Sequence, residues 1–381
     1  MKVLYLTVPS FFDLEISLIR ELSKLVDVEV LMILSPQSMH SSAFSINKLD
    51  NRCCIIPATE YKGMEQYSDF INLQKWNIAN NPSNSLIDCW HLSSLIKNYY
   101  KKGGFNLLHC TTNCKTVTFL LPFIKSLPNK ILTKHDPIPH DKPSLLTRII
   151  RIDAFHKAFK NLLLLSDALL EPFCKTYSFD KTHIYFSRLS VYDFLTKYPN
   201  DKSIGEEYIL FFGRIEPYKG VDLLINAFST SEANKRGIKL VIAGKGQIDG
   251  LNKTHIDNVV ILNRYIENRE LSSLIRNCKF VVLPYRTATQ SGCVMSAYAF
   301  NKPILVTNVG DLPKEVIDNV TGLVCNPNDV KSLKAGIDQL ASQDLSIYEK
   351  NIFGRYNEQG ELSWHSAALS IVSAYHKIQK S

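Results

Sequence analysis

The sequence has no run of about 18 consecutive apolar residues, the length that a membrane-spanning helix requires. Residues 1–6 lack the apolar stretch and the small-residue cleavage site of a secretory signal, so we expect a strand there. The nine cysteines of this 381-residue chain show no metal-ligand spacing, and their odd number indicates reduced thiols. Together these absences predict a cytoplasmic protein without a structural metal.

Acidic residues are scarce in one segment. Residues 101–160 hold eleven Lys or Arg residues against three Asp and no Glu. Within this segment, residues 145–165 predict a helix with an apolar and a basic face. Such a surface suits an anionic membrane or a phosphorylated substrate, and it also suits a helix face that is merely solvated. We expect no nucleic acid partner, because no aromatic-interleaved basic motif occurs.

Short apolar runs alternate with amphipathic helical patterns in both halves of the chain. This alternation predicts mostly parallel α/β domains, and the length favours two of them, because single cores rarely grow beyond roughly 250–300 residues. We expect two doubly wound Rossmann-like domains facing a cleft, residues 1–200 and 201–363, and a final helix, 364–381, packing back toward the first domain. A polar stretch at 198–203 is the expected linker, and 35–90 the expected loop-rich insertion.

Two cations follow one of the expected strands. An apolar run ends at Gly213, an amphipathic helix pattern follows, and a second apolar run ends at Gly244. Arg214 and Lys219 lie just beyond the first run, at the carboxyl end of a strand, where open α/β sheets bind ligands. Two positive charges at this place suit a diphosphate, so the pattern predicts a nucleotide-sugar site.

Residues 213–224 resemble the Gly-Arg-x(4)-Lys-Gly block of the GT-B glycosyltransferases, in the retaining group called family 4 or group 1. Blocks similar to those that follow in this family occur at 241–246, 291–310 and 321–324, in the family's order and spacing. The resemblance covers most of residues 208–330. It implies a GT-B fold and the transfer of a sugar from a nucleoside diphosphate.

The resemblance implies that Arg214 and Lys219 stabilise the negative charge that grows on the departing diphosphate. Arg214 can form forked bonds to phosphate oxygens, while Lys219 adds a mobile point charge. The alternative interpretation makes both residues surface ion-pair partners of the neighbouring Glu216 and Asp222. Gly213 and Gly244, at the ends of the two apolar runs, are expected to contribute to donor binding.

Three further donor contacts follow from the same resemblance. Ser291 and Gly292 begin an expected helix whose first amides can bind phosphate, and an ordinary capped helix is the alternative interpretation. Gln290 lies beside them and is expected to reach sugar hydroxyls. In similar enzymes, the backbone at positions corresponding to Tyr265 and Ile266 receives the nucleotide base.

The first half of the chain resembles the family more loosely. His135 follows an expected strand, and the resemblance implies that it faces the donor sugar, whereas a lone histidine can also be structural. His109 is a weaker candidate, and Asp136 is expected to orient His135 or to contact the acceptor. Phe11 and Phe12 either stack on sugar or lipid, or begin a helix. No residue is assigned as general base, because retaining members are thought to use the leaving phosphate.

The sequence departs from the family in the region of the sugar. Two glutamates eight residues apart are usual, but counting back from Pro303 places Ala288 and Ser296 there. The loop after the first strand also lacks the family's paired glycines. No Asp-x-Asp motif occurs, so we expect protein cations to replace a metal and no cofactor apart from the donor.

We therefore expect a peripheral membrane, metal-independent, retaining transferase. It would move a hexose from a UDP- or GDP-sugar to a saccharide acceptor in surface polysaccharide biosynthesis, and we expect that acceptor to be lipid-linked. A transferase with a free sugar or small-molecule acceptor is the nearest alternative. A non-catalytic GT-B protein that binds nucleotide sugars and a sugar-nucleotide epimerase also remain open.

Overall fold

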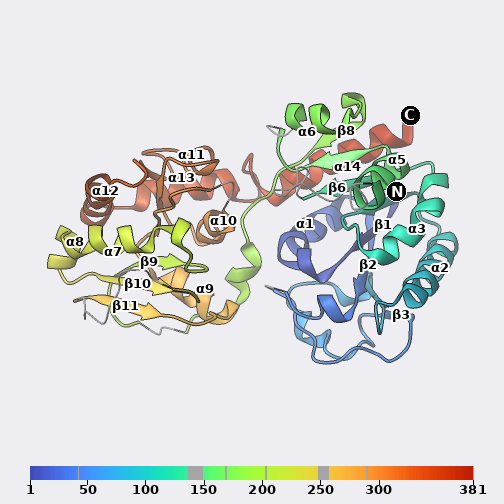
Figure 1. Cartoon of the computed structure of the whole chain (residues 1–381), viewed down its shortest axis with the longest axis horizontal. Coiled ribbons are helices and arrows are strands. Elements are labelled where there is room, and N and C mark those ends of the chain that lie inside the picture. The colour runs from blue at the N-terminus through green and yellow to red at the C-terminus, as the bar shows by residue number, and fades with distance from the viewer. Residues whose placement is uncertain are drawn as a thin grey trace. The chain divides into compact units, whose positions relative to one another are not determined.

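Two largely parallel β-sheets organise the chain (Figure 1). The computed structural model describes residues 1–41, 43–135, 149–167, 170–201, 204–247, 257–288 and 291–380. The chain divides into unit 1, formed by Met1–Leu189 with Trp364–Ser381, and unit 2, formed by Ser190–Ser363. Each unit has its own sheet and its own covering helices, as the GT-B fold requires.

The sheet of unit 1 has the strand order β3-β4-β2-β1-β5-β6-β7-β8, and every pairing except β3 with β4 is parallel. Parallel strands covered on both faces are nearly continuous apolar runs, and β1 accordingly carries Val-Leu-Tyr-Leu between its terminal Lys2 and Thr7. The strands are β1 (Lys2–Thr7), β2 (Asp27–Leu34), β3 (Cys54–Pro57), β4 (Trp76–Asn80), β5 (Leu107–Cys110), β6 (Lys130–Lys134), β7 (Leu162–Leu164) and β8 (Ile184–Phe186).

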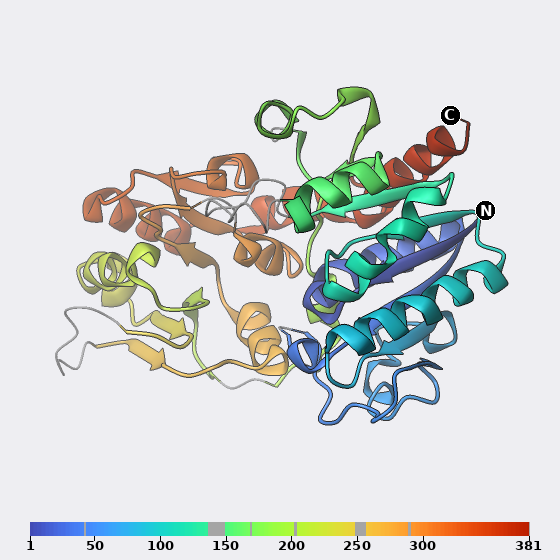
Figure 2. The ribbon, with the colours of Figure 1, turned by 45° about the vertical axis from the view of Figure 1, so that its right-hand side comes forward.

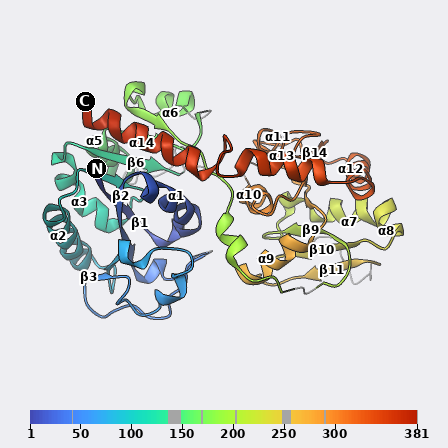
Figure 3. The same ribbon diagram turned by 180° about the vertical axis from the view of Figure 1, so that it is seen from behind.

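Helices cover both faces of this sheet. Alternate residues of β1 point to opposite faces, so Leu4 and Leu6 join a core with α2, α3 and α5, which Figure 2 shows side by side. Tyr5 points to the other face, where α1 and α14 pack against each other (Figure 3). The helices of the unit are α1 (Phe12–Leu25), α2 (Leu86–Gly103), α3 (Lys115–Ser126), α5 (Ala154–Phe159), α6 (Leu170–Tyr177) and α14 (Trp364–Lys380).

The last helix is tied to the interior of unit 1 by a buried histidine. The Nδ1 atom of His109 lies 2.5 Å from the Tyr375 hydroxyl of α14, and its Nε2 atom lies 2.6 Å from Oγ1 of Thr133. Ser187 adds a hydrogen bond to the Ala367 carbonyl. Because both ring nitrogens of His109 are bonded and its ring is fully buried, this residue holds the fold together and cannot reach a ligand.

The sheet of unit 2 has the order β11-β10-β9-β12-β13-β14, and all its pairings are parallel. All carboxyl ends therefore lie at one edge of the sheet. The strands are β9 (Tyr208–Phe212), β10 (Lys239–Ala243), β11 (Val259–Leu262), β12 (Val281–Leu283), β13 (Ile304–Thr307) and β14 (Gly322–Cys325). The helices are α7 (Val221–Ser229), α8 (Glu232–Lys235), α9 (Asn268–Asn277), α10 (Gly292–Tyr298), α11 (Leu312–Glu315), α12 (Val330–Ser342) and α13 (Ser346–Tyr356).

The structure corrects three details of the sequence-based prediction. The boundary falls after Leu189 rather than at residue 200, because Arg276 of α9 donates to the carbonyls of Thr196 and Tyr198 and so holds this stretch in unit 2. The expected insertion, 35–90, contributes two strands to the sheet. The helix expected at 145–165 ends at Phe159, because Lys160 has a positive φ and the chain then enters β7.

Among the described residues, none of the helices combines the length and the apolar character that crossing a bilayer would require.

Burial should make His109 a source of acid sensitivity. Burial, with a smaller contribution from His135, lowers the pKa of His109 from 6.5 to about 3. The unfolded chain therefore takes up a proton below pH 6.5 that the folded chain refuses, so this stability is complete above pH 6.5 and is lost as the pH falls toward 3. We expect His109→Gln to be destabilised by on the order of a few kcal/mol at pH 7, with the difference from wild type shrinking at pH 4.5. Thermal unfolding at both pH values measures this, with the exposed His40→Gln as control; a difference independent of pH would contradict it.

Candidate functional site

The backbones that leave β9 and β10 run against each other at the carboxyl edge of unit 2. Gly213 N–H donates to the Ala243 carbonyl at 3.0 Å, and Ile215 N–H donates to that of Lys245 at 2.9 Å. A Cβ on Gly244 would lie 1.8 Å from the Gly213 carbonyl oxygen, and one on Gly246 would lie 1.9 Å from that of Ile215. Glycine is therefore required at 244 and 246 by the packing of two backbones, whatever binds beside them.

Arg214 and Lys219 are not engaged with carboxylates. Arg214 is exposed and has no ion pair within the described part of the chain. Lys219 ends the short helix η9 (Pro217–Lys219), and its Nζ lies 3.8 Å from the centre of the Tyr285 ring. Burial lowers the pKa of Lys219, and the charge of Arg214 acts in the same direction. A half-buried cation beside a second, exposed cation is an arrangement that a multiply charged anion stabilises.

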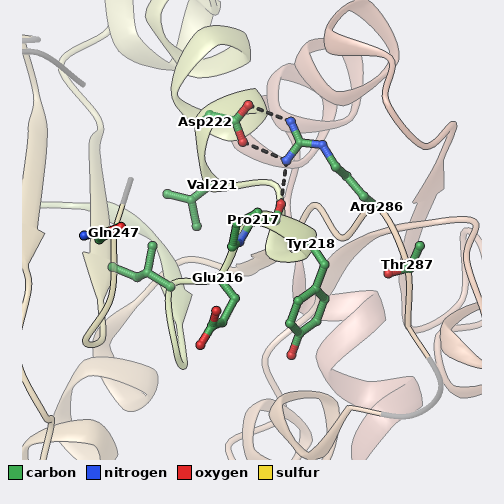
Figure 4. Close-up of a pocket in the computed structure, with 9 residues that line it drawn as sticks. Glu216, Pro217, Tyr218, Val221, Asp222, Gln247, Arg286 and Thr287 are labelled. Carbon is green, nitrogen blue, oxygen red and sulfur yellow. Dashed lines mark hydrogen bonds and ion pairs between the residues drawn. The ribbon is translucent and has the colours of Figure 1, made fainter. Parts of the chain in front are cut away.

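In the described structure, Arg214 and Lys219 form no ion pair with Asp222, which was an alternative that the sequence left open. Its carboxylate receives both Arg286 guanidinium nitrogens, at 2.8 and 2.6 Å, and the same guanidinium donates to the Pro217 carbonyl at 2.7 Å (Figure 4). The backbone N–H of Arg286 also donates to the carbonyl of Tyr218 at 2.7 Å. Arg286 thus fixes the turn that carries Lys219. Arg286 and Asp222 border a pocket of about 340 Å³ that also has Tyr218 and Gln247 in its wall.

Ser291 and Gly292 lie where the sequence predicts. Helix α10 begins at Gly292 with Ser291 as its N-cap residue, and it ends at Tyr298. Ser291 is buried, and its Oγ lies 3.2 Å from the Tyr285 hydroxyl. The structure therefore brings Lys219 and Ser291 to the same tyrosine. Gln290, predicted to contact the sugar, lies outside the described residues.

A carboxyl group that sequence reasoning missed approaches the start of α10. Glu315 of α11 accepts a hydrogen bond from the Ser291 backbone N–H, and its Oε2 is buried without a partner in the described structure. Burial, reinforced by Asp311, raises the pKa of Glu315 to about 8. The hydroxyl of Ser296, in the place of the second missing glutamate, donates to the Gly292 carbonyl within the helix. No sequence spacing indicates that Glu315 should come close to Ser291.

Tyr265 and Ile266 follow β11 at the same sheet edge. The Tyr265 side chain is 64% exposed, and the neighbouring Arg264 is held by a two-pronged ion pair with Glu270 at 2.7 Å. The loop is thus anchored while its backbone stays near the surface. Its role in receiving a base stays a prediction.

His135 lies at the carboxyl edge of the unit 1 sheet, beside a buried carboxylate that the sequence did not reveal. Its Nε2 lies 3.3 Å from Oε1 of Glu15, and its ring stacks on Phe11 with centroids 3.8 Å apart. The other oxygen of Glu15 accepts from Thr7 at the end of β1. The Nδ1 atom of His135 has no hydrogen-bond partner in the described structure. Glu15 and Phe11 therefore fix the ring, with one nitrogen left unused.

Of the two alternatives that the sequence left open for Phe11 and Phe12, stacking on a ligand or beginning a helix, Phe12 takes the second. It begins α1 and is buried against Phe44, Tyr67 and Trp76, so it belongs to the core. Phe11 instead supports His135. Asp136, expected to orient this histidine, lies outside the described residues.

The basic segment at 101–160 is described only in part, because residues 136–148 lie outside the described structure. Lys130 turns inward and donates to the carbonyls of Lys125 and Leu127, so it adds nothing to a basic surface. Exposed lysines do remain, at positions 101, 102, 115, 125, 157 and 160. Where the chain is described, no three His, Cys, Asp or Glu side chains gather as metal ligands.

Comparison with known proteins places this site in a family. Residues 196–359 match the model of the glycosyl transferases group 1. The chain is 26% identical over 176 residues to the glycogen synthase of Mycobacterium tuberculosis, spanning 45% of this chain and 42% of that protein. It is 22% identical over 295 residues to an uncharacterized glycosyltransferase of Methanocaldococcus jannaschii, spanning 71% of each.

The solved structures extend the likeness to both units. HepE of Anabaena, in complex with UDP, superposes with a TM-score of 0.66 at 13% identity, over 99% of this chain and all of the other. A glycosyltransferase of Rickettsia africae gives a TM-score of 0.64 at 13% identity, over all of this chain and 99% of its own. The fold is therefore GT-B, as predicted, and residues 196–359 are similar to the group 1 glycosyltransferases. It spans less than half the length of the mycobacterial glycogen synthase.

The raised pKa of Glu315 predicts a loss of stability as the pH rises from 4.5 to about 8. The folded protein keeps a proton up to about pH 8 that the unfolded chain releases near 4.5, so this contribution is complete below pH 4.5 and is lost as the pH rises to 8. Glu315→Gln, which is neutral at every pH, should unfold about 2–4 °C higher than wild type at pH 8 and nearly together with it at pH 4.5. Melting curves across this range test the prediction, with the exposed Glu267→Gln as control; parallel pH profiles for wild type and Glu315→Gln would refute it.

The contact between Glu15 and His135 predicts a single tautomer. A carboxylate only accepts hydrogen bonds, so Nε2 must carry the proton that it donates to Glu15. Glu15→Gln can donate as well as accept, so we expect two tautomers in that variant, visible in long-range ¹H–¹⁵N spectra of the histidine ring. Glu21→Gln, which changes another buried carboxylate of α1, should leave the His135 signals unchanged. A mixture already present in wild type would contradict the assignment.

Proposed function

We propose that this protein transfers a hexose from a UDP- or GDP-sugar, without a metal and with retention of the anomeric configuration. One observation carries the proposal: Lys219, half-buried, and Arg214, exposed, lie together beyond β9, and neither has an ion pair in the described structure. The family match over residues 196–359 supports this interpretation, and so does the UDP bound to the structurally similar HepE.

The two cations suit the charge change of the reaction. Breaking the bond between the sugar carbon and the β-phosphate leaves negative charge on the diphosphate, and fixed positive charge stabilises that state more than the ground state. Arg286 holds the turn in advance, so little reorganisation is needed at the moment of reaction. The departing phosphate accepts the proton of the acceptor hydroxyl, so no protein base is assigned.

We assign His135 to the donor sugar. Glu15 holds its Nε2 and Phe11 its ring face, and its Nδ1 is buried without a partner among the described residues. An aromatic and a carboxylate that immobilise one imidazole reduce the entropy lost when a ligand binds to it. Gln290, Tyr265 and Ile266 keep the sugar and base contacts predicted for them.

For the acceptor we propose a lipid-linked saccharide used in surface polysaccharide biosynthesis. One similar protein, 24% identical over 189 residues, is encoded in the cps region of Klebsiella pneumoniae. The exposed lysines of the 101–160 segment give the protein a means of resting on an anionic membrane. Binding to vesicles with and without anionic lipid distinguishes this acceptor from a free sugar.

A non-catalytic protein that binds nucleotide sugars is the second candidate. Ala288 and Ser296 stand where the family usually has glutamates, and the Ser296 hydroxyl is used inside its own helix. Incubation with a panel of radiolabelled sugar nucleotides separates the two candidates. Binding without transfer or hydrolysis would favour the second, and NMR of the recovered sugar would reveal an epimerase.

Removing either cation should weaken nucleotide binding. We expect Lys219→Met and Arg214→Ala each to reduce the affinity for UDP or GDP by about 10- to 100-fold, since hydrogen bonds to charged groups contribute roughly 1.5–3 kcal/mol. Isothermal titration measures the affinity, and the losses should shrink as salt is raised. Lys239→Met is the matched control, because Lys239 lies at the amino end of β10 and pairs with Glu206. Equal affinities for Lys219→Met, Arg214→Ala and wild type would reject the donor site.

A further inference from the structure

Tyr285, at the carboxyl edge of the unit 2 sheet, makes contacts through both its ring and its hydroxyl. It follows β12 and is 1% exposed. The centre of its ring lies 3.8 Å from Nζ of Lys219, and its hydroxyl lies 3.2 Å from Oγ of Ser291. Its backbone carbonyl accepts from the hydroxyl of Thr307 at 2.5 Å, which fixes the residue to β13. A buried tyrosine with this set of contacts connects separate segments of the candidate donor site.

The ring gives Lys219 a partner that carries no net charge. An ammonium group that loses water usually gains a carboxylate, and the pair is then nearly neutral. The negative face of an aromatic ring attracts the ammonium through its quadrupole and leaves the full positive charge in place. Tyr285 therefore compensates part of the desolvation of Lys219 while keeping its charge available to an anion.

The residues on either side of Tyr285 hold the same turn. A Cβ on Gly220, directly after Lys219, would lie 2.1 Å from the Pro284 carbonyl oxygen, so the turn passes very close to the end of β12. Arg286 fixes the turn through the carbonyls of Pro217 and Tyr218. The backbone of the Lys219 turn and its ammonium group are thus both positioned from one short segment, 284–286.

We propose that Tyr285 is a positioning residue of the donor site, which holds the Lys219 ammonium and the Ser291 hydroxyl in the geometry that binds the diphosphate. The proposal rests on the proposed function, because it assumes that Lys219 binds the donor. It is specific about the means: the ring orients the cation, and the hydroxyl orients Ser291. Tyr285 itself need not touch the diphosphate.

A double-mutant cycle on the full-length protein tests this role, with UDP or GDP as the probe, whichever wild type binds. Tyr285→Leu should reduce affinity about 5- to 30-fold, whereas Tyr285→Phe, which keeps the ring, should lose less than about 5-fold. In a Lys219→Met background, Tyr285→Leu should cost clearly less affinity than in wild type, because the part of its action that passes through Lys219 is already lost and only the part through Ser291 remains. Circular dichroism and melting curves confirm that each variant is folded, and Tyr285→Met replaces Tyr285→Leu if the latter is not.

Tyr208→Leu is the matched control. Tyr208 is equally buried, at the amino end of β9 and so at the opposite edge of the sheet from the cations, and its hydroxyl donates to the Leu274 carbonyl. It should lower stability without lowering affinity. If both leucine variants weaken binding alike, or if the effect of Tyr285→Leu persists undiminished without Lys219, the positioning role is overturned. If Lys219→Met binds the nucleotide normally, the proposed donor site itself is wrong. If Lys219→Met loses affinity but Tyr285→Leu binds normally, the donor site stands and Tyr285 has no part in it.

Discussion

Parallel pairing of β9 with β10 and β12 is the constraint on which the candidate site of unit 2 depends. Because all three strands end at one edge, the segments that follow them must share a small space, and the closest backbones leave room only for glycine at 244. The same pairing brings the end of β12 against the turn after β9. The chemistry attributed to Lys219 is therefore a consequence of strand order as much as of residue type.

Local sequence patterns predicted the parts of the site that lie within one βα unit. Gly213, Arg214 and Lys219 follow a single apolar run, so their common location could be read directly, and the two-unit α/β fold followed from the repetition of such runs. The partners of these residues could not be read in this way. Tyr285 follows β12 and Glu315 lies in α11, both much later in the sequence, and only tertiary packing brings them there.

The buried carboxyl groups of Glu15 and Glu315 differ in how well their oxygens are supplied with hydrogen-bond donors. Glu15 is surrounded by donors, with a threonine hydroxyl on one oxygen and an imidazole on the other. Glu315 receives one backbone N–H and has an oxygen without a partner among the described residues, so burial favours its neutral form. Neither residue stands out in the sequence, because a glutamate on an amphipathic helix ordinarily faces solvent, and only its register against the sheet buries it.

The return of α14 to unit 1 has a consequence for folding during synthesis. Unit 2 is a continuous segment, whereas unit 1 needs the last residues of the chain to cover α1 and to satisfy His109. As the chain leaves the ribosome from its amino end, unit 1 must wait, with an apolar helix face uncovered, until the whole of unit 2 has emerged. The domain that is made first is thus the one that is completed last.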